Sequence, residues 1–144
     1  MVGHDEIRAL IPHAGSMCLL ERVLDWDDEH IRIATASHAS ASNPLRSRGR
    51  LRAVHLCEYG AQAMAVHGGL LARAGGSTAA PGMLVSLRDV HFGVGFVDEL
   101  PGELEVEAER LHATAGSWQY AFRVLHAGRE LARGRAAVMI RRPA

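Results

Sequence analysis

The sequence predicts an α+β domain in which a curled antiparallel sheet wraps around one long central helix. Two strand candidates precede a long apolar helix candidate, and four more strand candidates follow it. Short turns separate consecutive strands, which is typical of antiparallel pairing. The chain has 144 residues, enough for one sizeable core, and we expect one domain over residues 1–144.

The elements that precede the long helix are short. Residues 5–10 carry apolar side chains at helical spacing, and Pro12 ends this helix candidate because proline has no backbone N–H to donate. Residues 18–26 and 30–37 are rich in apolar and β-branched side chains and are strand candidates. The acidic run 27–29 between them predicts a turn, so the two strands should form a hairpin.

The central helix candidate spans residues 53–73. It is rich in Ala, Leu and Met, and Glu58 is its only acidic residue. A helix that is apolar on nearly all sides is expected to be buried on nearly all sides. The polar stretch 38–52, which contains the pair Asn43–Pro44, precedes the helix and predicts a long loop. A loop of this length in a small domain usually has a function.

The part of the chain after the helix predicts a run of antiparallel strands. Apolar and polar side chains alternate with a period of two, and Gly116 and Gly128 mark two of the turns. The four strand candidates are residues 83–92, 102–113, 117–127 and 129–141.

Composition argues against several classes of function. The 16 arginines are balanced by 16 acidic residues, whereas a nucleic-acid-binding protein usually carries a basic excess, so we expect no nucleic-acid partner. Cys18 and Cys57 form no disulfide framework, and the nine histidines show no metal-ligand spacing, so we expect no metal. The absence of a glycine-rich phosphate loop argues against a nucleotide cofactor. No signal peptide or membrane-spanning stretch is evident, which favours a cytoplasmic protein without a membrane partner.

Glu58 is the most informative residue of the helix, because burying an acid among apolar side chains costs free energy unless the acid is paired or protonated. Gln62 lies one turn further on the same face, and His13, His38 and His55 lie near this site in the sequence. A histidine and a carboxyl group in one apolar cleft form a general base and a general acid. The alternative is structural: Glu58 stabilises the amides at the helix N-terminus, and each histidine fills a hydrogen-bonded position.

Several segments, in their order along the chain, resemble motifs of the β-hydroxyacyl-ACP dehydratases of fatty-acid synthesis. Residues 58–62 are similar to that family's ExxAQ helix motif, and Ile11–Pro12–His13 to the start of its IPHxxxxLLVDRV opening. The other matching segments are residues 18–23, 86–92, 101–104 and 126–132. The resemblance implies the hotdog fold, in which a curled sheet surrounds a long helix, in agreement with the pattern of elements above.

The resemblance also implies a reaction: dehydration of a β-hydroxyacyl thioester, carried on the phosphopantetheine arm of acyl carrier protein, to the trans-2-enoyl thioester. Glu58 would act as the acid, with no metal or redox cofactor. The family's catalytic histidine lies in the motif HFPGxPxxPG, which this chain lacks, and the equivalent spacing before Glu58 falls on Pro44. The chain therefore resembles a divergent branch, the dehydratases of aryl polyene gene clusters, and His38 and His13 are both candidates for the base.

Five further residues are candidates for contact with the substrate or its carrier, namely Asn43, His55, Gln62, Arg48 and Arg50. The two arginines belong to a basic loop that suits an acidic carrier protein or the phosphate of its prosthetic group. An exposed sheet edge predicts a dimer, formed by two copies or with a related hotdog protein. Two other functions stay open: a hotdog thioesterase acting on acyl-CoA or acyl-ACP, and a catalytically inactive subunit that completes a dehydratase heterodimer.

Overall fold

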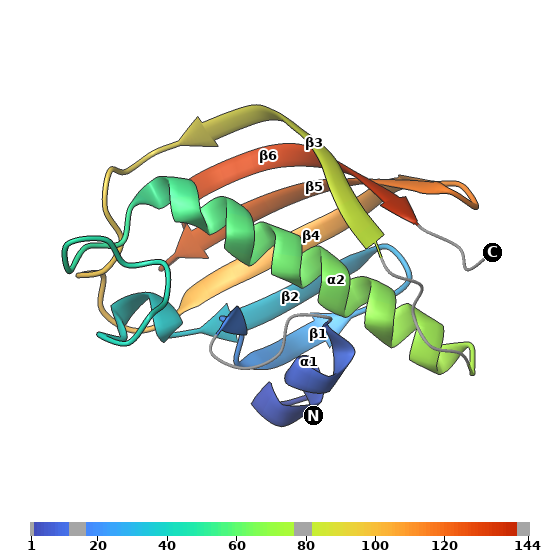
Figure 1. Cartoon of the computed structure of the whole chain (residues 1–144), viewed down its shortest axis with the longest axis horizontal. Helices are drawn as coiled ribbons and strands as arrows, with labels where there is room; N and C mark the ends of the chain where they lie inside the picture. Colours follow the sequence, from blue (N-terminus) through green and yellow to red (C-terminus); the bar gives the residue numbers. More distant parts are fainter. Residues whose placement is uncertain (1, 12–16, 77–81, 141–144) are drawn as a thin grey trace.

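A computed structural model describes residues 2–11, 17–76 and 82–140 of the chain. Six antiparallel strands form one curled sheet in the order β1-β2-β4-β5-β6-β3, and the long helix α2 lies across its inner face (Figure 1). The helices are α1 (His4–Leu10) and α2 (Leu56–Ala74), and the strands are β1 (Arg22–Trp26), β2 (His30–Thr35), β3 (Gly82–Phe92), β4 (Leu104–Ala113), β5 (Ser117–His126) and β6 (Arg129–Ile140). The predicted α+β hotdog architecture is confirmed.

The largest difference from the predicted elements is in the first strand, which begins at Arg22 rather than at residue 18. The backbone of Leu19 is engaged by side chains instead of by a strand ladder. Its N–H donates to Gln62 Oε1 at 2.9 Å, and its carbonyl oxygen accepts a hydrogen bond from Thr35 Oγ1 at 2.6 Å. The second strand ends at Thr35 rather than at residue 37, because a 3-10 turn spans Ser37–Ala39.

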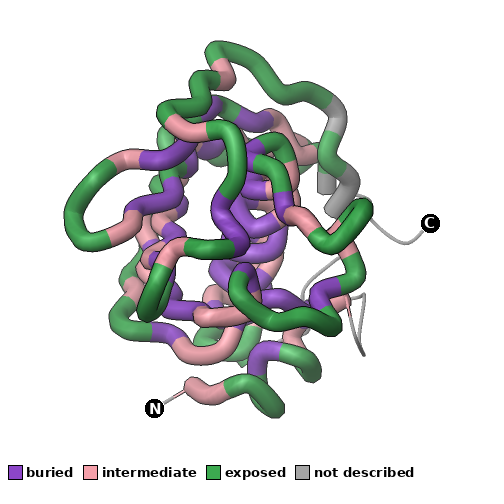
Figure 2. Tube along the Cα trace, turned by 90° about the vertical axis from the view of Figure 1, so that its left-hand side faces the viewer, coloured by how far each residue is buried: buried purple, intermediate pink, exposed green. Residues whose placement is uncertain are grey.

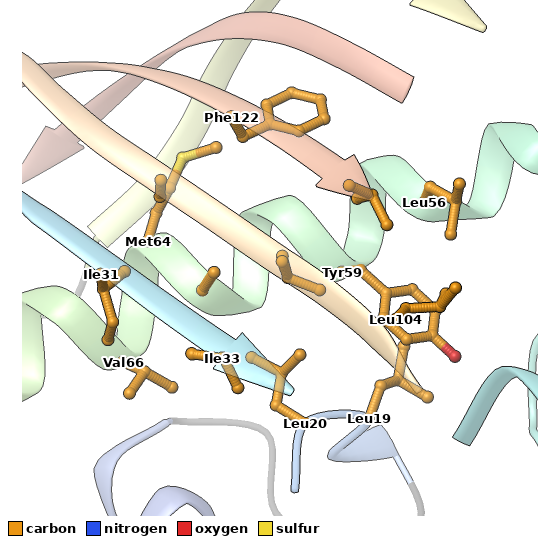
Figure 3. Close-up of a cluster of buried hydrophobic side chains, with 14 of the residues drawn as sticks. Leu19, Leu20, Ile31, Ile33, Leu56, Tyr59, Met64, Val66, Leu104 and Phe122 are labelled. Carbon is orange, nitrogen blue, oxygen red and sulfur yellow. The ribbon is translucent and has the colours of Figure 1, made fainter. Parts of the chain in front are cut away.

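The core lies between α2 and the inner face of the sheet. Figure 2, seen roughly along α2, shows the buried residues gathered around this helix and on the strands that face it. Figure 3 shows part of this cluster, with the labelled side chains Leu19, Leu20, Ile31, Ile33, Leu56, Tyr59, Met64, Val66, Leu104 and Phe122. Each large apolar side chain removed from water contributes about 1.5–3 kcal/mol to the free energy of unfolding, so this contact holds α2 against the sheet.

Phe122 of β5 fits between two glycines. A Cβ atom at Gly60 of α2 would lie 2.5 Å from Phe122 Cδ2, and a Cβ atom at Gly134 of β6 would lie 2.9 Å from Phe122 Cε1. Both distances are shorter than any van der Waals contact, so the absence of a side chain at these two positions lets the helix approach the sheet closely.

A buried polar contact fixes the middle of α2. His67 Nε2 donates to the carbonyl oxygen of Asp27 at 2.7 Å, and His67 Nδ1 therefore accepts the hydrogen bond from Tyr120 Oη, also at 2.7 Å. His67 and Tyr120 are almost completely shielded from solvent. Burial lowers the pKa of His67, so the neutral ring joins α2 to β5 and to the turn between β1 and β2.

The stability of the protein should fall as the pH falls below about 6.5, the ordinary pKa of an unfolded histidine. His67 and His38 are both fully buried, and burial lowers the pKa of each below that value. The unfolded chain therefore binds protons near pH 6 that the folded chain does not, and this difference favours unfolding. Urea denaturation between pH 5 and pH 8 measures the effect. The variant His67→Gln should roughly halve the pH dependence in this window; an unchanged dependence would contradict this explanation.

The two edges of the sheet differ. β1 has five residues, and its Val23 N–H donates to Val2 O at 2.9 Å, so the N-terminal segment covers part of this edge. β3 has 11 residues, and no other described strand pairs with its outer edge. Its side chains Leu84, Leu87 and Phe92 are exposed. A long edge strand that carries exposed apolar side chains is a favourable place for another chain to bind.

The expectation that α2 is buried on nearly all sides is not met within the single chain. Cys57, Ala61 and Ala65 follow one another at a spacing of four along the outer side of the helix, and all three are only partly buried. The sheet covers one side of α2, and among the described residues α1 contacts the helix near Gly69, while no second layer covers Cys57, Ala61 and Ala65. Within the described part of the chain, no helix is long and apolar enough to cross a membrane.

Candidate active site

Glu58 lies in the first turn of α2. The sequence predicts a buried acid, whereas Glu58 is only partly buried, because it lies on the flank of the helix rather than on the side packed against the sheet. Its Oε1 accepts a hydrogen bond from Gln62 Nε2 at 3.1 Å. A carboxyl group held in this way at the N-terminal end of a helix is fixed in direction and still accessible to a ligand.

Gln62 joins Glu58 to the chain segment that precedes β1. The Gln62 Nε2 group also donates to Met17 O at 2.6 Å, and its Oε1 accepts from Leu19 N–H at 2.9 Å. Both ends of the buried amide are therefore occupied by the protein itself. This geometry makes Gln62 a residue that positions Glu58, rather than one with a free group for the substrate.

A second buried polar cluster lies beside the first turns of α2. Tyr59 Oη hydrogen-bonds to Ser37 Oγ at 2.9 Å and accepts from Asn43 Nδ2 at 2.9 Å. Asn43 also donates to Ser37 O and accepts from Leu45 N–H, both at 2.9 Å. Ser37 Oγ in turn donates to Leu19 O at 2.6 Å. The side chain of Asn43 thus holds the loop against α2, and all its polar atoms have partners within the chain.

His38 lies in the 3-10 turn after β2 and is fully buried. Its Nε2 is 2.9 Å from Leu100 O, and because a carbonyl oxygen accepts only, Nε2 carries the proton. Nδ1 is buried and has no hydrogen-bond partner in the described part of the chain. Desolvation lowers the pKa of His38, so this imidazole is neutral and has one unused lone pair, but it lies beneath the surface.

His55 ends the 3-10 turn Ala53–His55, which leads directly into α2. It is partly buried, and its Nδ1 is shielded from solvent with no hydrogen-bond partner among the described residues. Glu58 follows His55 by three residues in the sequence. His13, the other histidine predicted near the site, lies outside the described residues.

The loop arginines predicted to contact the carrier differ in their surroundings. Arg50 Nε donates to both carboxylate oxygens of Asp98, at 3.1 and 2.9 Å, and its guanidinium lies 4.1 Å from the centre of the Phe96 ring. Arg48 is exposed, with a positive φ of 53°, and hydrogen-bonds to no other described residue. Arg50 thus has a structural role in holding the loop, and Arg48 presents its charge to solvent.

The first turns of α2 bring together the carboxyl group of Glu58, fixed by Gln62, and the imidazole of His55. A carboxyl group and an imidazole are the kinds of group that acid–base chemistry uses, whereas the backbone N–H groups of Ala53, His55 and Leu56 already donate to carbonyl oxygens of the chain. Among the described residues, no three side chains of His, Cys, Asp or Glu gather in a geometry that could hold a metal ion.

The family model described as ApeP-like, ApeP dehydratase, matches residues 5–143. The chain belongs to the ApeP-like dehydratase family. A comparison with curated protein sequences gives no match. The family assignment supports a dehydratase-type enzyme, and it agrees with the resemblance found in the helix motif at residues 58–62.

Solved structures similar to this ApeP-like protein share its fold. The structure titled "The Dehydratase Heterocomplex ApeI:P from Xenorhabdus doucetiae" matches with a TM-score of 0.85 and 22% identity, over 94% of this chain and 91% of that chain. AziG from S. sahachiroi matches with a TM-score of 0.60 and 17% identity, over 85% and 91% of the two chains. A hypothetical thioesterase with coenzyme A from Streptococcus pneumoniae TIGR4 matches with a TM-score of 0.62 and 12% identity, over 83% and 84%.

Sequence reasoning missed the polar cluster around Tyr59 and Ser37. A tyrosine in an apolar helix fits the core pattern by its ring alone, and its hydroxyl becomes informative only when a partner is known. The one available signal was the pair Thr35 and Ser37 at the end of an apolar strand, because hydroxyl groups that become buried require hydrogen-bond partners.

Proposed function

We propose that this protein dehydrates a β-hydroxyacyl thioester, carried by acyl carrier protein on its phosphopantetheine arm, to the trans-2-enoyl thioester. The observation that carries the proposal is the carboxyl group of Glu58, which Gln62 holds at the start of α2 in a member of a dehydratase family. A reaction in which water leaves an acyl chain needs one group to remove a proton and one to protonate the leaving hydroxyl. The proposed setting is aryl polyene or fatty-acid synthesis in the cytoplasm.

In the proposed mechanism, the positive N-terminal end of the α2 dipole lies near the thioester carbonyl oxygen and makes the proton on the adjacent carbon more acidic. A neutral histidine removes the α proton, the electrons of the C–H bond form the double bond, and the β hydroxyl leaves with the proton of Glu58 as water. The histidine then holds the proton that Glu58 has lost, and its return resets the site. His38 and His13 are the bases that the sequence suggests.

The direct test is product analysis. The protein, alone and together with any related hotdog subunit from the same gene cluster, is incubated with 3-hydroxyacyl carrier protein, and the acyl chain is followed by mass spectrometry. Loss of one water with the thioester intact supports dehydration. Release of free carrier thiol would instead identify a thioesterase. That alternative is kept because the fold is shared with a hypothetical thioesterase from Streptococcus pneumoniae.

We further propose that the outer edge of β3 pairs with a second hotdog chain, either another copy or a related subunit. Leu84, Leu87 and Phe92 are exposed on this strand, and the outer side of α2 is also only partly covered. The similar structure from Xenorhabdus doucetiae is titled a heterocomplex, which supports a related chain as the partner. If activity appears only when the partner is present and survives the loss of Glu58, this chain is the inactive subunit of the pair.

Sedimentation velocity at micromolar concentration should show a dimer, with the related subunit or without it. Association through β3 buries apolar side chains and satisfies unpaired backbone groups of the strand. Leu87→Arg should weaken the dimer, because it places a charge in the contact. Leu24→Arg, a change at another exposed leucine in β1, is the control and should leave association unaltered. A monomer in both preparations would contradict the proposal.

A further inference from the structure

The backbone places His55 and Glu58 on one face of the same helix. The turn Ala53–His55 continues into α2 without a break, and His55 itself has right-handed helical angles, with φ of −69° and ψ of −14°. Residues three apart on a helical backbone are neighbours on its surface, with Cβ atoms about 5–6 Å apart. The next residue on this face is Gln62, which already holds the carboxyl group of Glu58.

The imidazole of His55 has unused hydrogen-bonding capacity. Nδ1 is shielded from solvent, and neither ring nitrogen hydrogen-bonds to another described residue. A shielded polar atom without a partner costs free energy, and a catalytic role is one of the reasons for which such an atom is retained. No hydrogen bond or ion pair joins the side chains of His55 and Glu58 in the described part of the chain, so the two groups are not already paired with each other.

The other buried histidines are less suited to act with Glu58. Both ring nitrogens of His67 are engaged, one by Tyr120 and one by the Asp27 carbonyl oxygen. The Nδ1 atom of His38 also lacks a partner, but His38 is fully buried, its Nε2 is fixed by Leu100 O, and it lies in the turn after β2 rather than on α2. Among the described residues, His55 is the only histidine within one helical turn of Glu58.

We propose that His55 and Glu58 form the proton-transfer pair of this site, with His55 as the base. The assignment rests on the proposed dehydration. In that reaction a ring nitrogen of His55 takes the α proton of the substrate, the Cα–Cβ double bond forms, and the Cβ–O bond breaks as Glu58 protonates the hydroxyl. The pair then returns to its starting state when the proton on His55 passes to the carboxylate of Glu58.

The first part of the experiment measures turnover of 3-hydroxybutyryl and 3-hydroxyoctanoyl thioesters of N-acetylcysteamine by the complete protein with its partner subunit. His55→Gln should lower kcat by roughly 100-fold or more, the scale for loss of a positioned base, with an unchanged unfolding midpoint. His55→Asn should behave alike, since neither amide transfers protons. His112→Gln, at an exposed histidine in β4, is the matched control. Near-normal turnover in both His55 variants, or loss of turnover in His38→Gln alone, would overturn the assignment.

The second part measures the pair without any reaction. NMR spectra of the His55 ring in the wild type and in Glu58→Gln should show that the change at Glu58 shifts the ring signals, because side chains three residues apart on a helix are neighbours and are coupled. The ring of His112 should be unaffected. If the wild type dehydrates no thioester but this coupling is present, the proposed function fails and the pair stands. If the coupling is absent, the pair fails whatever the activity.

Discussion

Glu58→Gln should lower dehydratase turnover by roughly 100-fold or more and leave the unfolding free energy unchanged or slightly higher. Glutamine keeps the volume of the side chain and an oxygen that can accept the hydrogen bond from Gln62. It loses the proton that must reach the departing hydroxyl, so the chemical step suffers while the packing does not. The measurement is kcat on a 3-hydroxyacyl thioester, together with urea denaturation of the same preparation.

Two controls separate a catalytic role from a structural one. Glu109→Gln makes the same chemical change at an exposed position in β4 and should leave both quantities unaltered. Gln62→Leu removes the group that orients Glu58, and it should lower turnover and also stability, because it leaves Met17 O and Leu19 N–H without their partner. A Glu58→Gln protein that keeps near-normal turnover, or loses activity only in proportion to unfolding, would make Glu58 a structural residue.

Gly60→Ala should destabilise the protein by about 3 kcal/mol, near the upper end of the usual cost of overpacking a core. The added methyl would lie 2.5 Å from Phe122 Cδ2, and the ring has little room to move away because it already packs closely against Gly134 of β6. The helix or the strand must therefore shift. Urea denaturation followed by circular dichroism measures the loss.

The same helix offers a matched control. A Cβ atom at Gly68 would lie 3.5 Å from Trp118 Cζ3, an ordinary contact, so Gly68→Ala should be neutral or stabilise by up to about 1 kcal/mol through helix propensity. Phe122→Leu should partly rescue Gly60→Ala, since a smaller side chain makes room for the methyl. Equal effects of the two alanine substitutions, or no rescue, would show that the contact at Phe122 does not determine the approach of α2.

The order of the elements was predictable because it follows from periodicity, which local sequence carries directly. The run of alternating side chains after the helix predicted β4, β5 and β6 closely, and the apolar stretch predicted α2. The start of β1 was not predictable, because the backbone of Leu19 is hydrogen-bonded to the side chains of Gln62 and Thr35, which are distant in the sequence. The hydrophobic pattern identifies residues that favour a strand, but the partners of their backbone N–H and carbonyl groups depend on the tertiary structure.

For the candidate site, Glu58 and Gln62 were predictable as a pair, since helical spacing alone places them on one face. Asn43 was predicted to contact the substrate, whereas in the structure its side-chain amide is hydrogen-bonded to Tyr59, Ser37 and Leu45. No rule of sequence spacing connects these partners. Spacing in the sequence also could not decide which histidine is free to act with Glu58. Burial and hydrogen bonding decide which imidazole is free, and both depend on segments far apart in the sequence.

The unequal edges of the sheet limit how far the protein can polymerise. A sheet with two open edges can add subunits at both ends and grow into a fibre, whereas a sheet with one open edge stops after a single addition. Here Val2 O of the N-terminal segment accepts a hydrogen bond from the Val23 N–H of β1. The strand β1 is also short and irregular, with a bulge between Val23 and Asp25. Association is therefore expected at β3 alone, and the pair proposed above would be closed to further addition. Removal of the first few residues should open the second edge and favour linear aggregates.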